Sequence, residues 1–549
     1  MHRRSSVALG LGLACAFVLG AMAACGGGGA NSAFGSNGNG DGGSNGSGSG
    51  TGIVTLGSGT SGILHGGSGT GGTGGSGTGG TSGGGCPAGL QCDVACSGGA
   101  TTTISGKVFD PAGKDPLSGI TVYVPANPLT PLPKGVPTGA DMCSCSALYP
   151  SGAVVAQTTA VDGSFKLTNA PVGSSVPLVI QVGKWRHVTQ INVTACQDNA
   201  QTNGTLKLPG TVAAGDTNDN MPDIAVSTGE ADTLECLLLR MGVSASEYVP
   251  GNSTAGHVHV FSGGDSTGGG HGGGGSVGTP ERTPMAGAPS SYSTTNGLWT
   301  SQAQLMPYDV VLLSCEGGET YNADPSQLEL YLNAGGRAFA SHFHYAWFSG
   351  PLSSAGTNTY TVPPDWGNLA TWAADGTGGM SSAAVGGVID TTLNGSTMPF
   401  QKGLTLSTWL DENGALGGVT GVTAVELPIY QPRYNAIVGP SNTPSQPWIT
   451  ADPSAHQTDS TLYFSFDTPV NGGPNYCGRA VFSDLHVSGN PSTKDNTSLP
   501  PPASCDNVDL SPQEKALEFM LFDLSSCVIP DTAVVSPDAG LPPPPPMSK

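Results

Sequence analysis

The chain has 549 residues, a formal net charge of −21 at pH 7 and only 18 Lys and Arg residues. Because nucleic acid and anionic lipid surfaces are bound by clustered basic side chains, and no such cluster occurs, neither is an expected partner. The 13 cysteines favour an oxidising compartment.

Residues 1–25 are predicted to be a lipoprotein signal peptide. A basic start at 2–4 precedes an apolar run at 7–19 that is too short to span a membrane, and small residues then reach Cys25. "MAAC" resembles a bacterial lipobox, which implies lipidation of Cys25 and anchoring in the cell envelope, at the outer membrane or cell surface. The alternative is an ordinary signal cut near Ala24 and a soluble secreted protein.

Low-complexity segments flank the remainder of the chain. Residues 26–85 are almost wholly Gly, Ser, Thr and Asn, and we expect a disordered tether because they cannot bury enough apolar surface to fold. Residues 531–549 include "DAGLPPPPPMSK" and are predicted to form a disordered, Pro-rich tail.

The cysteines fall into two groups after the signal peptide. Six lie in the first half, and this even, clustered set predicts disulfides of open connectivity: Cys86, Cys92, Cys96, Cys143, Cys145 and Cys196. Metal binding by "CSC" at 143–145 is the less favoured alternative. The other five are odd in number, so at least one is free or pairs outside its group: Cys236, Cys315, Cys477, Cys505 and Cys527.

Residues 86–210 are predicted to form a small all-β sandwich. Apolar residues alternate with polar ones in short runs that turn residues separate, and Asp162-Gly163 is expected to make a hairpin turn. "ISGKVFDPAGKDPLSGITVYV" and "TTAVDGSFKLTNAPVG" resemble the carboxypeptidase regulatory-like domain, a transthyretin-like sandwich. The resemblance implies a non-catalytic domain of a fold shared with carbohydrate-binding modules, and residues 126–150 are an insert that the family lacks.

Two features near the end of this region have a functional and a structural interpretation. Trp185 is either a ring that stacks on a sugar or, as we favour, a core residue. "GDTNDNMPD" (215–223) begins like a calcium loop, but Met221 and Ser227 stand where that loop has Gly and Glu. We therefore interpret this segment as a linker turn.

Residues 224–530 alternate between strand and helix patterns, which predicts a doubly wound, flavodoxin-like α/β domain. "YDVVLLS" (308–314) is a continuous apolar run, typical of a strand buried on both faces. Capping signals predict helices that begin near Asp324 and Ser511.

"YDVVLLS", "ELYLNAGGRAFASHFHYAWF" and "CGRAVFSDLHVS" resemble the class I glutamine amidotransferase-like superfamily, and more closely its trehalose-utilisation (ThuA-like) branch. In the amidotransferases the second segment leads to a catalytic cysteine, whereas His342 stands there in this chain, as a histidine does in the ThuA-like branch. Cys315 belongs to the preceding strand, so the resemblance does not imply glutaminase chemistry.

Chemically active side chains follow two of the predicted strands: Cys315 and Glu316 follow one, and His342 and His344 the next. Ligands of open α/β sheets bind at the carboxyl ends of strands, so these four are candidate catalytic residues. The other interpretation, which we favour for an exported chain, is that Cys315 forms a disulfide, for example with Cys236.

Two further sets of residues are candidate binding sites. "HVH" and "HFH" predict a less favoured divalent-metal site from His257, His259, His342 and His344, with Asp484 or His486 nearby. Trp347, together with Trp366 and Trp409, would suit a sugar-binding rim.

The sequence therefore predicts a cell-envelope lipoprotein that acts as an extracytoplasmic binding or scaffold protein, without a cofactor and with carbohydrate as a candidate ligand. The alternative is a hydrolase or sugar-modifying enzyme that uses the histidines and Glu316 at the strand ends. A third interpretation is a purely structural envelope protein.

Overall fold

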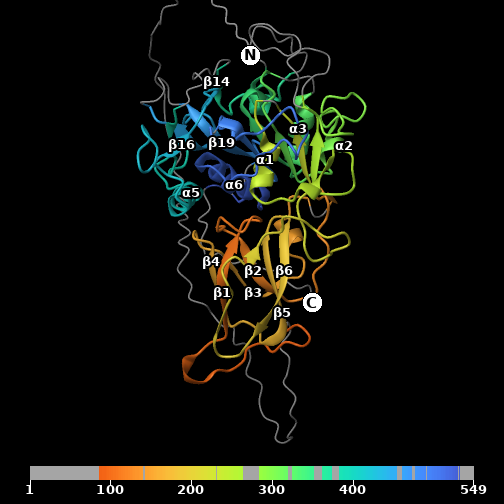
Figure 1. The fold of residues 1–549 in the computed structure, drawn as a ribbon, viewed down its shortest axis with the longest axis vertical. Coiled ribbons are helices and arrows are strands. Elements are labelled where there is room, and N and C mark those ends of the chain that lie inside the picture. The colour runs from red at the N-terminus through yellow and green to blue at the C-terminus, as the bar shows by residue number, and fades with distance from the viewer. Residues whose placement is uncertain are drawn as a thin grey trace, which may run out of the picture. The chain divides into compact units, whose positions relative to one another are not determined.

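The computed structural model describes residues 86–139, 142–229, 231–263, 283–319, 324–350, 361–373, 383–453, 460–472, 476–489, 491–529 and 531. The predicted signal peptide and tether, and the predicted tail apart from residue 531, lie outside these ranges. The described chain is rich in β-structure, with several sheets and few helices (Figure 1). No helix within these ranges is both long and apolar enough to cross a membrane.

The first part of the described chain forms two four-stranded sheets, here called the sandwich. In one sheet β1 lies between β4 and β7 and also pairs with β8, and the other sheet has the order β3-β2-β5-β6. The strands are β1 (Thr103–Phe109), β2 (Thr121–Pro125), β3 (Ala153–Thr158), β4 (Ser164–Thr168), β5 (Gly173–Val182), β6 (Trp185–Val193), β7 (Asp198–Ala200) and β8 (Leu206–Lys207).

The turn at Asp162-Gly163 does not make the predicted hairpin. It connects β3 to β4, but β3 pairs with β2 and β4 pairs with β1, so the turn carries the chain from one sheet to the other. Gly163 has a positive φ of 76°, and a Cβ there would lie 2.8 Å from the side chain of Pro116. Gly163 therefore lies where the chain crosses tightly from one sheet to the other. A sequence pattern cannot distinguish such a crossing from a hairpin turn.

The two residues that open β6 are buried and have structural roles. Trp185 is fully buried, and its ring meets that of Phe522 edge to face, which confirms it as a core residue. The side chain of Arg186 donates hydrogen bonds to the carbonyl oxygens of Asn218, Thr217 and Thr130, at 2.7, 3.0 and 3.1 Å. The guanidinium of Arg186 therefore holds the loop 215–223, which begins like a calcium loop, in place.

The remainder of the described chain is built on a ten-stranded sheet of order β10-β11-β9-β12-β13-β20-β19-β18-β15-β16. The first six strands are mutually parallel and the last four extend the sheet with antiparallel pairs. The strands are β9 (Ile224–Ser227), β10 (Tyr248–Pro250), β11 (Val258–Phe261), β12 (Val310–Leu313), β13 (Arg337–Ser341), β15 (Val385–Ile389), β16 (Leu427–Ile429), β18 (Gln446–Ala451), β19 (Thr461–Thr468) and β20 (Gly478–Ser483). A separate two-stranded sheet pairs β14 (Thr371–Trp372) with β17 (Ala436–Ile437).

Both faces of the central strands are buried. Along β12, Val310 and Leu312 belong to one hydrophobic cluster, while Val311 and Leu313 belong to another, as alternation across a strand requires. The first cluster contains residues of α1 (Leu234–Arg240), α5 (Gln401–Glu412), α6 (Pro512–Ser525) and the sandwich. The second contains residues of α2 (Gln302–Leu305), α3 (Pro325–Asn333) and α4 (Ala346–Ser349).

The predicted helix starts are confirmed, with one difference. Ser511 and Glu514 form the capping box of α6, and the Asp324 side chain accepts the N–H of Ser326 at the start of α3. Gln327, which stands three residues after Asp324 as in a capping box, instead accepts the N–H of Gln302 at the start of α2. Short 3₁₀ turns complete the chain: η1 (Ser97–Gly99), η3 (Cys145–Leu148), η4 (Ala245–Glu247), η5 (His342–Tyr345), η6 (Pro364–Trp366) and η7 (Val487–Gly489).

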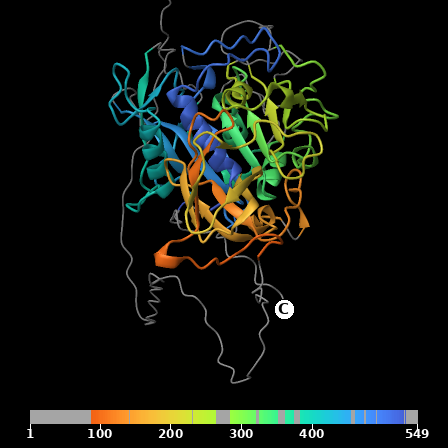
Figure 2. The same ribbon diagram turned by 60° about the horizontal axis from the view of Figure 1, so that its bottom comes forward.

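Disulfides join the sandwich to the large sheet. Cys86 pairs with Cys92 and Cys96 with Cys196, but the two cysteines of "CSC" pair with Cys477 and Cys527, and Cys236 pairs with Cys505. The insert 126–150 is therefore a staple between the two parts, and its cysteines are not available to a metal. Figure 2 shows α6 (blue) behind the strands of the sandwich (orange to yellow). The ring of Trp185 in β6 meets that of Phe522 in α6.

Candidate functional site

Three parallel strands bring their carboxyl ends together at one edge of the large sheet. Leu313 of β12 is paired with Ala340 of β13, and Ser341 of β13 with Ser483 of β20. A polar residue lies just beyond the end of each strand: Cys315 after β12, His342 after β13 and His486 after β20. The register therefore places these three side chains at neighbouring strand ends, where open α/β sheets bind ligands.

The three side chains form one compact group, here called the Cys–His–His cluster. The Sγ atom of Cys315 lies 3.2 Å from Nδ1 of His342, and the ring centroids of His342 and His486 lie 5.0 Å apart. One ligand atom from each residue falls within 4.8 Å of the other two. The exposed fractions of Cys315, His342 and His486 are 0, 5 and 1%. The sequence-based prediction that Cys315 forms a disulfide with Cys236 is wrong, because its thiol is free.

The backbone at His342 has an uncommon conformation. Its φ is 46°, in the left-handed region, where β13 turns directly into η5 and then into α4. A non-glycine residue held there is strained, and such strain clusters at functional sites. The turn keeps the imidazole of His342 beside Cys315.

Asp232 links the three strand ends, and sequence reasoning missed it. Its Oδ2 accepts a hydrogen bond from the Ser341 hydroxyl at 2.5 Å, and its Oδ1 accepts the backbone N–H of Val487 at 2.8 Å and of Thr233 at 2.9 Å. The carboxylate therefore fixes the residues next to His342 and His486. The available signal was its place five residues after the first strand of the sheet, at the same edge.

Other predicted site residues make hydrogen bonds outside the cluster. Glu316 accepts the hydroxyl of Tyr292 at 3.2 Å, and the Nε2 of His344 donates to the carbonyl oxygen of Ser314 at 2.9 Å. Asp484 accepts the backbone N–H of Asn435 at 2.8 Å. These contacts brace the loops around the cluster.

Burial keeps the cluster uncharged. It raises the pKa of Cys315 to about 12 and lowers the pKa of His486 to about 3, with the positive charge of Arg433 lowering it further. The pKa of His342 is lowered by burial and then by His486 and Arg433. Cys315 therefore keeps its proton near neutral pH, and its thiol donates a hydrogen bond to His342. A protonated thiol is a poor nucleophile. Neutral imidazoles keep the lone pairs that a metal ion needs.

The less favoured metal set of four histidines is not brought together. His257 and His259 lie at the start of β11, where their rings meet Glu247 and Asp223, with nitrogen–oxygen distances of 2.6 and 3.2 Å. His342 and His344 follow the carboxyl end of β13, at the opposite edge of the sheet. The four-histidine hypothesis is therefore wrong, because the two motifs occupy opposite ends of parallel strands.

The tryptophans expected at a sugar-binding rim lie in the core. The exposed fractions of Trp347, Trp366 and Trp409 are 1, 1 and 0%. Trp347 packs against Trp299, and Trp409 donates from Nε1 to the carbonyl oxygen of Pro116 in the sandwich. A sugar stacks on an exposed ring face, so this expectation is corrected.

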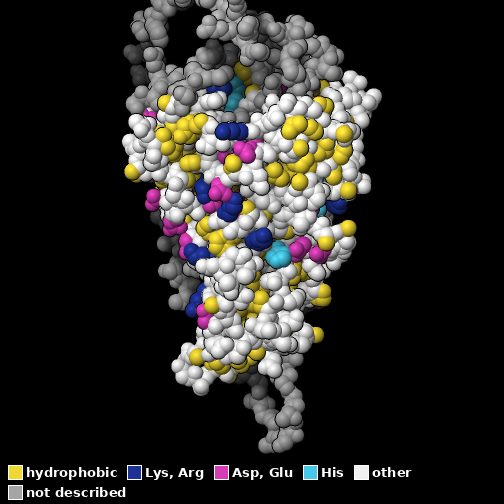
Figure 3. Space-filling model, viewed as in Figure 1, with side chains coloured by type: hydrophobic (Ala, Val, Ile, Leu, Met, Phe, Trp, Pro, Cys, Tyr) yellow, Lys and Arg dark blue, Asp and Glu magenta, His cyan; other side chains and the backbone are white. Residues whose placement is uncertain are grey.

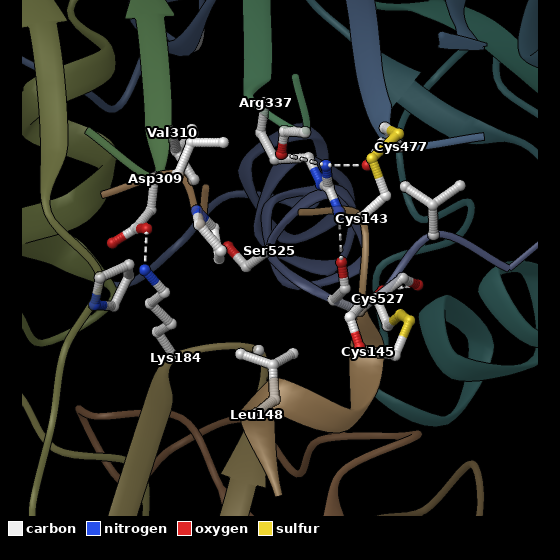
Figure 4. A pocket seen from close by; sticks show the side chains of 18 of the residues that line it. Cys143, Cys145, Leu148, Lys184, Asp309, Val310, Arg337, Cys477, Ser525 and Cys527 are labelled. Atoms are coloured by element: carbon white, nitrogen blue, oxygen red, sulfur yellow. Dashed lines mark hydrogen bonds and ion pairs between the residues drawn. A yellow bond between two sulfur atoms is a disulfide. The ribbon is translucent and has the colours of Figure 1, made fainter. Parts of the chain in front are cut away.

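A cavity of about 120 Å³ lies at the opposite edge of the sheet, next to the staple (Figure 4). Its cations already have partners: Lys184 forms an ion pair with Asp309 at 2.5 Å, and Arg337 donates to several backbone carbonyl oxygens, including that of Cys477 at 2.8 Å. We interpret the cavity as a polar seam between the sandwich and the large sheet.

Surface charge is mixed on one face of the molecule. On the face shown in Figure 3, Lys and Arg side chains (dark blue) are scattered and lie near acidic ones (magenta). Nucleic acid requires a continuous basic surface, and this face does not present one.

Comparisons with known proteins do not identify a family for this chain. No protein-family model matches the chain, and no curated protein matches it. Among solved structures, an N-terminal and a C-terminal interface mutant of a type II cohesin–X-dockerin complex from Acetivibrio cellulolyticus are similar, each at 16% identity and a TM-score of 0.14. Each match covers 28% of this chain and 78% of the other, and a likeness at this TM-score carries no inference.

Proposed function

We propose that this chain is an exported protein that binds a thiophilic transition-metal ion of the Zn²⁺ class through Cys315, His342 and His486. The observation that carries the proposal is the convergence of one sulfur and two imidazoles within 4.8 Å in a buried site. Thiolate and imidazole are the ligands that zinc and copper prefer.

The distances fit this assignment. A tetrahedral Zn²⁺ with Zn–S and Zn–N bonds of about 2.3 and 2.1 Å holds its sulfur and nitrogen ligands about 3.5 Å apart. The separation of 3.2 Å between Cys315 and His342 is close to that value. Binding displaces the thiol proton, and the metal compensates the charge of the buried thiolate. Three protein ligands leave a fourth position for water or another ligand.

Neighbouring groups hold the ligands in place. Asp232 fixes the residues next to His342 and His486, and the Gln513 side chain of α6 donates to the carbonyl oxygen of His486. Nε2 of His486 has no hydrogen-bond partner within the described ranges. A buried nitrogen without a partner is costly, and a metal bond would remove that cost.

The wider setting supports an extracytoplasmic location. The five disulfides among the described residues are consistent with an oxidising compartment. We further propose that Cys25 is the lipid anchor and that the large sheet belongs to a doubly wound, amidotransferase-like domain. When the short edge strand β10 is left out, the order β11-β9-β12-β13-β20 favours the latter, since the first strand is then flanked by the next two in chain order as in flavodoxin-like folds.

The hydrolase alternative has less support. A thiol nucleophile needs a lowered pKa and access to substrate, but burial raises the pKa of Cys315 and leaves the side chain without exposed surface. The positive φ at His342 resembles a nucleophile elbow, but the side chain that it presents is an imidazole.

A cobalt titration tests the proposal. Protein with native disulfides is stripped with a chelator and titrated with Co²⁺, which reports a thiolate ligand through charge-transfer absorption in the near ultraviolet. We expect one equivalent to bind, and Cys315→Ser to abolish the absorption. His486→Ala should weaken binding by about 10-fold or more, whereas His187→Ala, in the sandwich, should leave it unchanged.

Because the site is buried, the metal content of freshly exported protein provides a second readout. About one zinc or copper per chain, lost in Cys315→Ser, is the expected result. Protein that contains no transition metal and shows no charge-transfer absorption after unfolding and refolding with Co²⁺ would refute the proposal.

A further inference from the structure

Three carboxyl groups meet where the sandwich contacts α6. Asp110 follows β1, Asp115 lies five residues later in the same turn, and Glu518 lies in the middle of α6. One oxygen from each falls within 4.8 Å of the other two. Their exposed fractions are 1, 6 and 0%. Here this group is called the carboxylate triad.

Among the described residues, the hydrogen bonds of the triad do not extend to Glu518. Oδ1 of Asp110 accepts the backbone N–H groups of Lys114 and Asp115 at 2.6 and 3.1 Å, and Asp115 forms an ion pair with Lys515. Both carboxylate oxygens of Glu518 lack a hydrogen-bond partner in the described part of the chain. Glu518 is thus a fully buried carboxylate that lies close to the carboxylates of Asp110 and Asp115.

Charge balance at the triad calls for protons or a bound cation. Three carboxylates and the single ammonium of Lys515 leave a formal charge of −2 in a buried volume. Burial of an unpaired carboxylate is costly, so the charge must be removed by protons or by a bound cation. Burial raises the pKa of Asp110 to about 6 and raises that of Glu518 well above its ordinary value.

We propose that Asp110, Asp115 and Glu518 bind a calcium ion that joins the sandwich to α6. Carboxylate oxygens are the hard ligands that Ca²⁺ selects, at about 2.3–2.6 Å. Two such oxygens on one ion can lie up to about 5 Å apart, which the observed spacing of 4.8 Å or less satisfies. Backbone carbonyls and water would complete the shell. The site is independent of the Cys–His–His cluster, whose sulfur and nitrogen donors do not suit Ca²⁺.

Thermal unfolding of the full chain with native disulfides tests the site. We expect the wild-type Tm to rise by about 2–4 °C between EDTA and a saturating millimolar Ca²⁺ concentration. Glu518→Gln should abolish that rise. This variant removes a buried charge, so in EDTA it should be at least as stable as wild type, and loss of the response would not reflect misfolding. Glu412→Gln, at an exposed position at the end of α5, is the matched control and should keep the full rise.

Two outcomes would overturn the proposal. Equal Tm values in EDTA and Ca²⁺, or an undiminished rise in Glu518→Gln, would mean that the triad shares protons and binds no calcium. An equal rise with Mg²⁺ at the same concentration would overturn the assignment to calcium. Isothermal titration with Ca²⁺ gives the stoichiometry, for which we expect one ion per chain.

Discussion

The staple should contribute far more to stability than a local disulfide. Cys143–Cys477 and Cys145–Cys527 span 334 and 382 residues. When one of these two disulfides is intact, the other closes a loop of only roughly 50 residues, which runs from Cys477 to Cys527. The chain-entropy model then gives about 4 kcal/mol for either bond alone at 25 °C, and about 9 kcal/mol for the loss of both.

Urea unfolding, followed by tryptophan fluorescence under non-reducing conditions, measures these losses in paired Cys→Ala variants. The matched control removes Cys86–Cys92, which closes a separation of only six residues, for an expected loss of about 2 kcal/mol. The reasoning would be refuted if removal of Cys143 and Cys477 cost no more than removal of Cys86 and Cys92.

Three further predictions concern buried side chains. Burial raises the pKa of Asp390 from 3.8 to about 6, so ionisation of this one side chain should cost the wild type up to about 3 kcal/mol of stability as pH rises from 4 to 6. Asp390→Asn, which cannot ionise, should lack that loss in urea unfolding at pH 4, 5 and 7; parallel pH profiles would contradict this. Cys315 should react with a thiol reagent at neutral pH only after unfolding, and rapid labelling of native, metal-free protein would disprove its burial. Trp347→Ala should cost about 3–5 kcal/mol in urea unfolding, and a stability near that of wild type would show that the ring is not a core residue.

Local features of the fold could be predicted from sequence because their causes are local. The apolar runs at β12 and β13 are buried on both faces of the sheet, and the box of Ser511 and Glu514 caps α6 as its spacing predicts. Their neighbours in the sheet could not be predicted to the same degree. Strands β15, β16 and β18 are short, and β15 contains two glycines, so no strong alternation marks them.

The candidate site was predicted in part for the same reason. That Cys315 and His342 follow neighbouring strands is readable from the order of apolar runs, and their contact confirms it. The position of His486 beside His342 depends on the pairing of β20 with β13, which are more than 130 residues apart in the chain. No local sequence pattern encodes that pairing. Asp232 escaped notice because its role is to accept hydrogen bonds from other strand ends. The tryptophans were misplaced because an aromatic residue after a strand looks the same in sequence whether it is buried or exposed.

The staple also sets the order in which this protein can mature. If the chain is exported amino end first, as proposed above, it presents Cys143 and Cys145 long before Cys477 and Cys527. During that interval both thiols are near the already exposed cysteines of the sandwich, with which they can pair wrongly. Oxidative maturation should therefore require a disulfide isomerase, and a chain truncated before Cys477 should be retained or degraded with unpaired thiols. The sandwich and the large sheet can therefore reach their native disulfides only together.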